Sequence, residues 1–304
     1  MEFQHLPVMV EEVMALLGCE PGRTYIDATL GGGGHASEIL RRTAPDGVVI
    51  GLDWDDEAVH EARKALMPFG ERVKIFRENF IHLPEILNEM KVEEVDGILL
   101  DLGLSSFQLE KRKRGFSFRE EGPLDMRMDQ RLDQTAAYIV NRLSADELKE
   151  ILHKYGEERW AKRIANAIVR EREGGSIETT QRLRMIAHHA IPRRFHPRKI
   201  DPATKTFQAF RIRVNDELEN LRRILDTGWE FLRKGGRMCV ISFHSLEDRM
   251  VKETFRKMEG RRDDGSRPEA VMRVLTRKPI TPCEKELRRN PRSRSGKLRC
   301  AERL

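Results

Sequence analysis

Four consecutive glycines, residues 31–34, separate a short apolar segment from the helix expected after it. Glycine adopts positive φ angles and lets a ligand approach the backbone closely, so this run suits a ligand-binding turn. Asp53 stands twenty residues after Gly33, at the end of the next apolar segment. A carboxylate in that position accepts hydrogen bonds from the two hydroxyls of an adenosine ribose. The turn and the acid together predict a cofactor that contains a nucleoside.

The glycines alone leave the class of cofactor open. Gly31, Gly33 and Ala36 also fit the G-x-G-x-x-G/A pattern of dinucleotide sites, so NAD suits the turn as well as S-adenosylmethionine does. No pattern in the chain suggests the acid/base histidine and substrate-binding arginine of a hydride-transfer site, which favours S-adenosylmethionine. An NAD-dependent oxidoreductase is kept as the alternative. His35, next to the turn, is interpreted from its spacing as a helix-start residue.

A second carboxylate ends the fourth apolar segment of the chain. Asp101 closes that segment, and Ser105 and Ser106 follow it. Ligands of open α/β sheets bind in the crevice at the carboxyl ends of the strands. The sequence therefore predicts a carboxylate and two hydroxyls at the same edge as the glycine turn, which again favours S-adenosylmethionine.

The elements that must position these residues alternate between strand and helix over the first hundred residues. Such a βαβ order predicts a parallel sheet, and right-handed crossovers place helices on both of its faces. The expected strands cover residues 24–29, 47–53, 73–76 and 95–101, and the expected helices cover 35–42, 56–66 and 83–90.

After about residue 130 the pattern predicts helices only. Ser144 and Glu147 form a capping-box pattern. Trp160, Ile164 and Ile168 fall on one helical stripe, and residues 180–190 are expected to form a further helix. We therefore expect an α/β domain made of residues 1–130 and 206–304, with an all-helical insertion at residues 131–205.

One long helix is expected next, from the 3.6-residue period of apolar residues between Phe207 and Leu225. Gly235 and Gly236 are expected to end it, and residues 237–243 return to strand character. Ser245 with Asp248 resembles a cap for the helix that follows, and His244 is left open as a substrate contact. Short strand-like pieces lie at residues 271–275 and 297–300.

The composition is typical of a folded protein that resides in a reducing compartment. The chain has 304 residues, of which 39% are hydrophobic and 35% charged. No apolar run reaches the ~18 residues of a membrane helix, and the first residues do not resemble a secretory signal. Four cysteines without CxxC spacing predict neither a disulfide framework nor a metal site, so we expect a cytoplasmic protein.

Positive charge is concentrated in three clusters. The net charge is only +6, but residues 182–215 hold nine Lys or Arg against one acid, and residues 284–304 hold eight against three. Residues 111–114, Lys-Arg-Lys-Arg, follow the fourth strand. This clustering is typical of contacts with the phosphates of RNA or DNA, whereas the simpler interpretation is solvated surface. Phe116 and Phe118 beside the third cluster are interpreted either as core or as a stack for an extruded base.

Over nearly its full length the chain resembles the bacterial 16S rRNA (cytosine-N4)-methyltransferases (RsmH/MraW). The resemblance rests on long strings of residues in the same order, which are more specific than a glycine pattern. The matching strings are HLPV (5–8), DATLGGGGH (27–35), DGILLDLGLSS (96–106) with Gln108, RGFSF (114–118), GPLDMRM (122–128), YGEE (155–158), PATKTFQA (202–209), SFHSLEDR (242–249) and NPRSRS (290–295).

The resemblance implies a class I (Rossmann-like) methyltransferase sheet with an inserted all-helical domain that recognises RNA. It implies N4-methylation of one cytidine, cytidine 1402, in the decoding centre of 16S rRNA within the small ribosomal subunit. A homodimer is left open, and no membrane is implied. By motif position, the residues implied to bind S-adenosylmethionine are Gly33, Gly34, His35, Asp53, Phe80, Asp101 and Gln108.

The implied reaction needs orientation and a proton acceptor. The lone pair of cytosine N4 is delocalised into the ring, so an in-line displacement at a sulfonium methyl depends on positioning. An acceptor near the N4 hydrogens would take the released proton. We assign Asp101, helped by Ser105 or Ser106, as that acceptor, against the alternative that Asp101 only shapes the cofactor pocket. A non-catalytic ribosome assembly factor is the other functional alternative.

Overall fold

The computed structural model describes residues 7–104, 114–118, 120–198, 200–260 and 269–304. Two compact units make up the chain. The first unit comprises Met1–Ser105 with Leu218–Leu304, and the second comprises Ser106–Glu217. The second unit extends beyond the expected insertion, 131–205, at both ends, because loop residues that precede the helices bond to the last helix of the unit.

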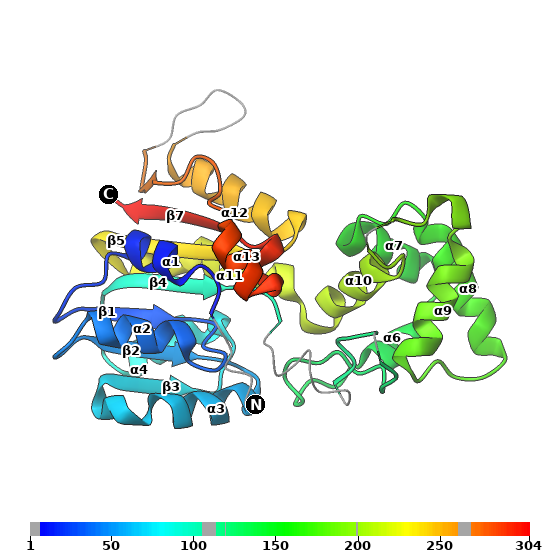
Figure 1. Cartoon of the computed structure of the whole chain (residues 1–304), viewed down its shortest axis with the longest axis horizontal. Helices are drawn as coiled ribbons and strands as arrows, with labels where there is room; N and C mark the ends of the chain where they lie inside the picture. The colour runs from blue at the N-terminus through cyan, green and yellow to red at the C-terminus, as the bar shows by residue number, and fades with distance from the viewer. Residues whose placement is uncertain (1–6, 105–113, 119, 199, 261–268) are drawn as a thin grey trace. The chain divides into compact units, whose positions relative to one another are not determined.

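The first unit is built on a mixed sheet (Figure 1). Its described strands lie in the order β3-β2-β1-β4-β5-β7-β6. Strands β1 to β5 pair in parallel, and β7 is antiparallel to both β5 and β6. The strands are β1 (Thr24–Asp27), β2 (Val48–Leu52), β3 (Val73–Phe76), β4 (Val95–Asp101), β5 (Leu232–Ser242), β6 (Met272–Val274) and β7 (Lys297–Arg303). The predicted α/β class and the four N-terminal parallel strands are confirmed.

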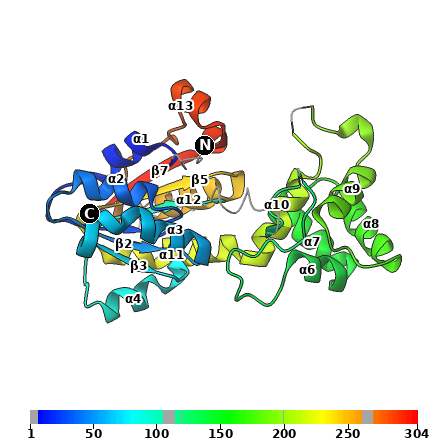
Figure 2. The same cartoon turned by 60° about the horizontal axis from the view of Figure 1, so that its bottom comes forward.

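Helices cover both faces of this sheet, and each face has its own apolar core. One core joins the sheet to α1 (Val10–Leu17), α2 (Gly34–Arg42) and α3 (Asp56–Leu66). The other joins it to α4 (Leu83–Glu89), α11 (Glu217–Thr227) and α12 (Ser245–Met258), as Figures 1 and 2 show. The central strands are apolar on both faces because both are buried.

Shorter elements connect these layers. They are α13 (Glu284–Arg289) and the 3-10 turns η1 (Met67–Arg72), η2 (Phe80–His82), η5 (Gly228–Phe231) and η6 (Pro291–Ser295). Within the described part of the chain, every helix is too short or too polar to span a bilayer.

The second unit is helical where it is described. It contains α6 (Ala136–Arg142), α7 (Ala145–Gly156), α8 (Ala161–Glu173), α9 (Thr180–Ala190), η4 (Arg193–Phe195) and α10 (Thr204–Asn215). The capping box of Ser144 and Glu147 is confirmed at the start of α7. Ile164 and Ile168 are buried as their stripe predicts, whereas Trp160 stands at the N-cap of α8 and is only half-buried.

The prediction of a single long helix between Phe207 and Leu225 is wrong. The segment forms two helices, α10 and α11, which separate at Asp216, where φ is 48°. Apolar periodicity does not reveal this break, because α10 and α11 each bury an apolar stripe of their own. Gly235 and Gly236 do not end a helix either. They lie inside β5, beside a shift in its register with β4.

Asn215, the last residue of α10, ties the preceding loop to the helices. It is 2% exposed. Its Nδ2 donates to the carbonyl oxygens of Met126 and Arg211, at 2.8 and 2.9 Å, and its Oδ1 accepts from the Met128 N–H at 2.7 Å. These bonds satisfy backbone groups that water does not reach.

We expect Asn215→Ala to lower the free energy of unfolding by about 2–4 kcal/mol, because buried partners of a lost hydrogen bond keep their full desolvation cost. Urea unfolding followed by circular dichroism measures the change. Arg142→Ala, at the exposed end of α6, is the matched control and should shift stability by less than about 0.5 kcal/mol. A loss below about 1 kcal/mol for Asn215→Ala would contradict this assignment.

Candidate active site

Three carboxylates meet at the carboxyl edge of the parallel strands. Asp27 ends β1, Asp101 ends β4, and Asp53 follows β2 directly. Strand β1 lies between β2 and β4, and Asp27 pairs in register with Gly51 and Leu99. Asp53 and Asp101 therefore lie two residues beyond the level of Asp27, and all three carboxylates are at the edge where open α/β sheets bind ligands.

The glycine turn and Asp53 are bonded to each other. The Gly31 N–H donates to Asp53 Oδ2 at 2.8 Å, and the Asp55 N–H donates to Oδ1 at 2.9 Å. A carboxylate has about four acceptor positions, so two are left after these bonds. The predicted partnership of turn and acid is thus present, with acceptor capacity for a pair of hydroxyls.

Gly33 and Gly34 meet requirements that other residues would not. Gly33 is the N-cap of α2 with a φ of 81°, and a Cβ there would lie 3.0 Å from Leu66 Cγ. A Cβ on Gly34 would lie 3.0 Å from Pro7 Cγ. In contrast, a Cβ on Gly31 would come no closer than 3.9 Å to another atom, which leaves open space on that side of the turn.

His35 links the turn to two other segments. The side chain is 5% exposed. Its Nε2 donates to the Val8 carbonyl oxygen at 2.9 Å, since a carbonyl oxygen can only accept. Its Nδ1 lies 3.6 Å from Asp101 Oδ2, and the Asp101 N–H donates to Thr29 Oγ1 at 2.6 Å. His35 is therefore packed beside Asp101, a neighbour that spacing along the sequence did not indicate.

Burial raises the pKa values of the carboxyl groups at this edge of the sheet. Loss of solvent raises the pKa of Asp27 to about 7 and that of Asp53 to about 6. The pKa of Asp101 is raised well above its ordinary value by burial and then by the nearby charges of Asp27, Glu247 and Glu286. A site of this kind favours a bound positive charge, which would offset the mutual repulsion.

Two carboxylate oxygens at this edge have no hydrogen-bond partner among the described residues. They are Asp27 Oδ2 and Asp101 Oδ1, and both are buried. Buried acceptors are nearly always satisfied, so these two indicate a ligand that brings donors or positive charge. Together with the open side of Gly31, they fit a cationic nucleoside such as S-adenosylmethionine.

Asp27 is a candidate that the sequence analysis did not select. It is 1% exposed, and one of its oxygens accepts from the Thr29 N–H at 3.3 Å. A signal was present in the sequence, since an acid at the end of an otherwise apolar strand, directly before the glycines, is costly to bury.

Of the remaining predicted site residues, the structure describes only Phe80. Phe80 begins η2 after β3 and packs, half-buried, against one apolar core of the sheet. Ser105, Ser106 and Gln108 lie outside the described residues. The geometry of the first unit therefore brings together the turn, His35, Asp53 and Asp101.

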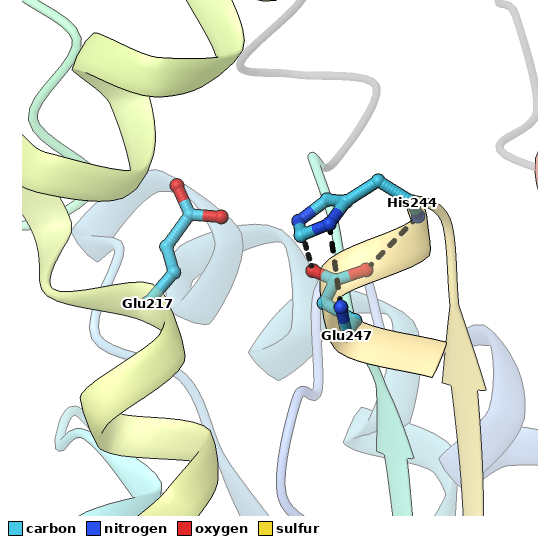
Figure 3. Close-up of side chains that lie close together, drawn as sticks. All are labelled: Glu217, His244 and Glu247. Atoms are coloured by element: carbon cyan, nitrogen blue, oxygen red, sulfur yellow. Dashed lines mark hydrogen bonds and ion pairs between the residues drawn. The ribbon is translucent and has the colours of Figure 1, made fainter. Parts of the chain in front are cut away.

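His244, not Ser245, caps α12, so the predicted cap is wrong. The His244 Nδ1 accepts from the Glu247 N–H at 3.4 Å, and Glu247 Oε2 accepts in return from the N–H groups of Phe243 and His244 (Figure 3). The helix begins at Ser245 itself, one residue earlier than an N-cap at Ser245 would allow. Asp248 instead pairs with Lys297 and Arg299 on β7. Glu247 is 3% exposed and adds to the acidic charge near Asp101.

Some arginines of the basic cluster at residues 182–215 form ion pairs within the protein. Arg184 pairs with Asp201, and Arg211 pairs with Glu217. Phe116 is buried, and the Phe118 ring lies 4.8 Å from that of Phe207. The two phenylalanines thus follow the core interpretation, and their use as a base stack is not supported.

The strand order, the glycine turn and the carboxylates at one edge define a Rossmann-like methyltransferase. Comparison with known proteins agrees. The chain belongs to the MraW methylase family, which matches residues 2–304. A methylase rather than an oxidoreductase is therefore the enzyme class of this chain.

Its relatives share the whole length of the chain. Proteins named ribosomal RNA small subunit methyltransferase H are 50% identical in Geotalea uraniireducens, 51% in Pelobacter propionicus and 49% in Geobacter sulfurreducens, with at least 99% of both chains covered. Among solved structures, TrmN from Thermus thermophilus aligns with 97% of this chain and 48% of its own. That pair is 12% identical with a TM-score of 0.45, a likeness too low to add to the family assignment.

We expect Asp27→Asn to stabilise the ligand-free protein at pH 8 by about 2–4 kcal/mol and to change little near pH 4. The pKa of Asp27 rises from 3.8 to about 7 on folding. Its contribution to stability is therefore full below pH 3.8 and is lost as the pH rises through 7, where a buried charge forms. Asparagine never forms that charge.

Urea unfolding at pH 4 and pH 8 measures the difference. Asp46→Asn removes an exposed carboxylate that also accepts from a backbone N–H, and is the control. A gain for Asp27→Asn that is equal at both pH values would show that the effect is not one of ionisation.

Proposed function

We propose that this chain transfers the methyl group of S-adenosylmethionine to the N4 amine of one cytidine, cytidine 1402, in the decoding centre of 16S rRNA. The observation that carries the proposal is the pair of unsatisfied, buried carboxylate oxygens of Asp27 and Asp101 beside the glycine turn. Membership of a methylase family supports the reaction class, and the names of its relatives support the small ribosomal subunit as the source of RNA.

The cofactor would be held by residues of the first unit. Asp53 would accept from the ribose hydroxyls with the two acceptor positions that Gly31 and Asp55 leave. Asp27 and Asp101 would face its positive charges, which offset the cost of burying both carboxylates. Once bound, S-adenosylmethionine supplies a methyl group activated by a sulfonium. We assign cofactor binding to Gly33, Gly34, His35, Asp53, Phe80, Asp101 and Gln108.

Asp101 would act on the amine that is methylated. A carboxyl with a raised pKa must lose its proton before it can accept another, and a positive charge bound nearby lowers that pKa again. Asp101 would thus become an acceptor only when the site is filled. It would then accept a hydrogen bond from N4 and take the released proton, with Ser105 or Ser106 as helpers.

The helical unit would recognise the RNA. Support comes from the excess of Lys and Arg over residues 182–215, of which only some are paired within the unit. We place the reaction in the cytoplasm, on the small ribosomal subunit or its precursor. A homodimer stays a prediction.

The decisive experiment is methyl incorporation from labelled S-adenosylmethionine into 30S particles that lack this modification, followed by mass mapping. We expect close to one methyl group per particle, on N4 of cytidine 1402. RNA binding without incorporation would instead indicate an assembly factor, and a methyl group at another nucleotide would overturn the assigned position.

We expect Asp101→Asn to lower kcat by about 10²–10⁴-fold, the usual contribution of a positioned general base. Asp53→Asn should instead weaken cofactor binding by about tenfold or more, because it disturbs a charge-assisted hydrogen bond, with kcat at saturation largely kept. Single-turnover kinetics and calorimetric titration with S-adenosylmethionine separate the two effects. If Asp101→Asn keeps wild-type kcat and loses only affinity, the catalytic role is disproved.

A further inference from the structure

Two aromatic side chains of the helical unit meet beneath arginines. The rings of Trp160 and Phe195 lie 5.1 Å apart at an angle of 42°. The Arg159 guanidinium lies 5.5 Å from both ring centres, Arg163 lies 5.6 Å from that of Trp160, and Arg194 lies 4.8 Å from that of Phe195. We name these five residues the Arg–aromatic platform.

The platform is on the surface, and hydrogen bonds hold the backbone at both of its aromatic residues. Phe195 is 39% exposed, and its three arginines are exposed as well. Trp160 is fixed at the N-cap of α8, where its N–H donates to the buried Glu158 at 2.8 Å. Phe195 ends η4, where its N–H donates to the Pro192 carbonyl oxygen at 2.8 Å.

The charges of the platform are not used within the described part of the unit. Arg159, Arg163 and Arg194 form no ion pair with any described residue, whereas Arg184 and Arg211 are held by acids. Phe118 and Phe207 show the contrasting case, because their ring contact lies among partly and fully buried residues. The exposed Phe195 ring, next to the half-buried Trp160 and three arginines that pair with no described acid, retains a stacking surface and nearby positive charge.

A groove continues from the platform between α8 and α9, two helices that lie side by side in Figures 1 and 2. Arg163 belongs to both. Its polar lining consists of Asn166, Arg170, Glu171 and His189, and Ala167 and Ile186 form an apolar floor. Its volume is about 250 Å³. This is below the ~300–1,000 Å³ of most small-ligand pockets, so the groove suits part of a longer chain.

We propose that the Arg–aromatic platform and this groove bind an unpaired stretch of RNA. One base would stack on the exposed ring of Phe195 and its guanidinium neighbours, and flanking phosphates would contact Arg159, Arg163 and Arg194. The inference rests on the proposed function for the RNA's identity as substrate. It assigns to the helical unit a definite surface and a preference for single strands.

A single-stranded partner suits the surface better than a duplex or an acidic peptide. Double-stranded RNA presents phosphates and sugars but hides the faces of its bases, so it would use the arginines and leave Phe195 without a role. An acidic peptide would likewise need the charges alone. An unpaired base next to its phosphates uses an exposed aromatic ring and adjacent cations together.

The test is fluorescence anisotropy with the full-length protein and a labelled oligouridine of about ten nucleotides. We expect Phe195→Ala to weaken binding by about 5- to 100-fold, and Phe195→Trp to restore it, since each stacked base contributes on that scale. Arg163→Ala should lower the slope of log Kd against log salt by about 0.7, the value for one lost contact with a single-stranded phosphate.

Two variants control for general effects. Tyr138→Ala removes another exposed aromatic of the helical unit, 46% exposed. Arg222→Ala removes an exposed cation of the first unit that is paired with Glu219 and Asp226. Both should bind the oligonucleotide as the wild type does. Thermal unfolding of each variant identifies any that fails to fold, and Phe195→Trp then carries the test.

Three outcomes would overturn the inference. They are wild-type affinity in Phe195→Ala, equal affinity for a duplex of the same length, and displacement of the oligonucleotide by polyglutamate at equal charge. Methyl transfer to 30S particles is measured in parallel. If the wild type methylates while the platform variants bind RNA normally, only the inference fails, and if the wild type binds RNA but transfers no methyl group, only the proposed function fails.

Discussion

The gathering of three carboxylates, one buried and two half-buried, at one edge of a parallel sheet is the constraint on which the first unit depends. Asp27, Asp53 and Asp101 come from neighbouring strands, and parallel pairing in register allows no other arrangement of their positions. Solvent is largely excluded, so their pKa values rise together. When no positive charge is bound, these carboxylates lower the stability of the folded protein. Groups with perturbed pKa values of this kind are common at binding sites.

The residues around these carboxylates hold them in place with backbone groups as well as with side chains. The Gly31 N–H fixes Asp53, Thr29 fixes the end of β4, and His35 connects Asp101 to Val8. No cationic side chain among the described residues pairs with Asp27 or Asp53. The positive charge that such a site needs is therefore left to a ligand, and a sulfonium nucleoside supplies both the charge and the ribose.

In the proposed function, the first unit would carry out the methyl transfer and the second would bind the RNA. The first unit concentrates acidic groups at its candidate site, whereas the second displays arginines and aromatic rings. Acidic groups suit a cationic cofactor and repel phosphates, so the same surface would serve RNA poorly. A separate basic surface would let the protein bind a polyanion without placing that charge on the cofactor site.

Local pattern was sufficient for the parallel strands, for α3 and α9, and for the partnership of the glycine turn with Asp53, because each depends on short-range spacing. The family strings identified the enzyme class for the same reason. Sequence alone did not reveal the break at Asp216, since periodicity continues across it, nor the cap at His244, since Ser245 is the commoner capping residue. It did not reveal the contact of His35 with Asp101, the central place of Asp27, or the pairing of Trp160 with Phe195 in place of the phenylalanines at 116 and 118. These are contacts between residues distant in the chain, and only packing in three dimensions decides which side chains meet, which charges stay unpaired and which rings remain exposed.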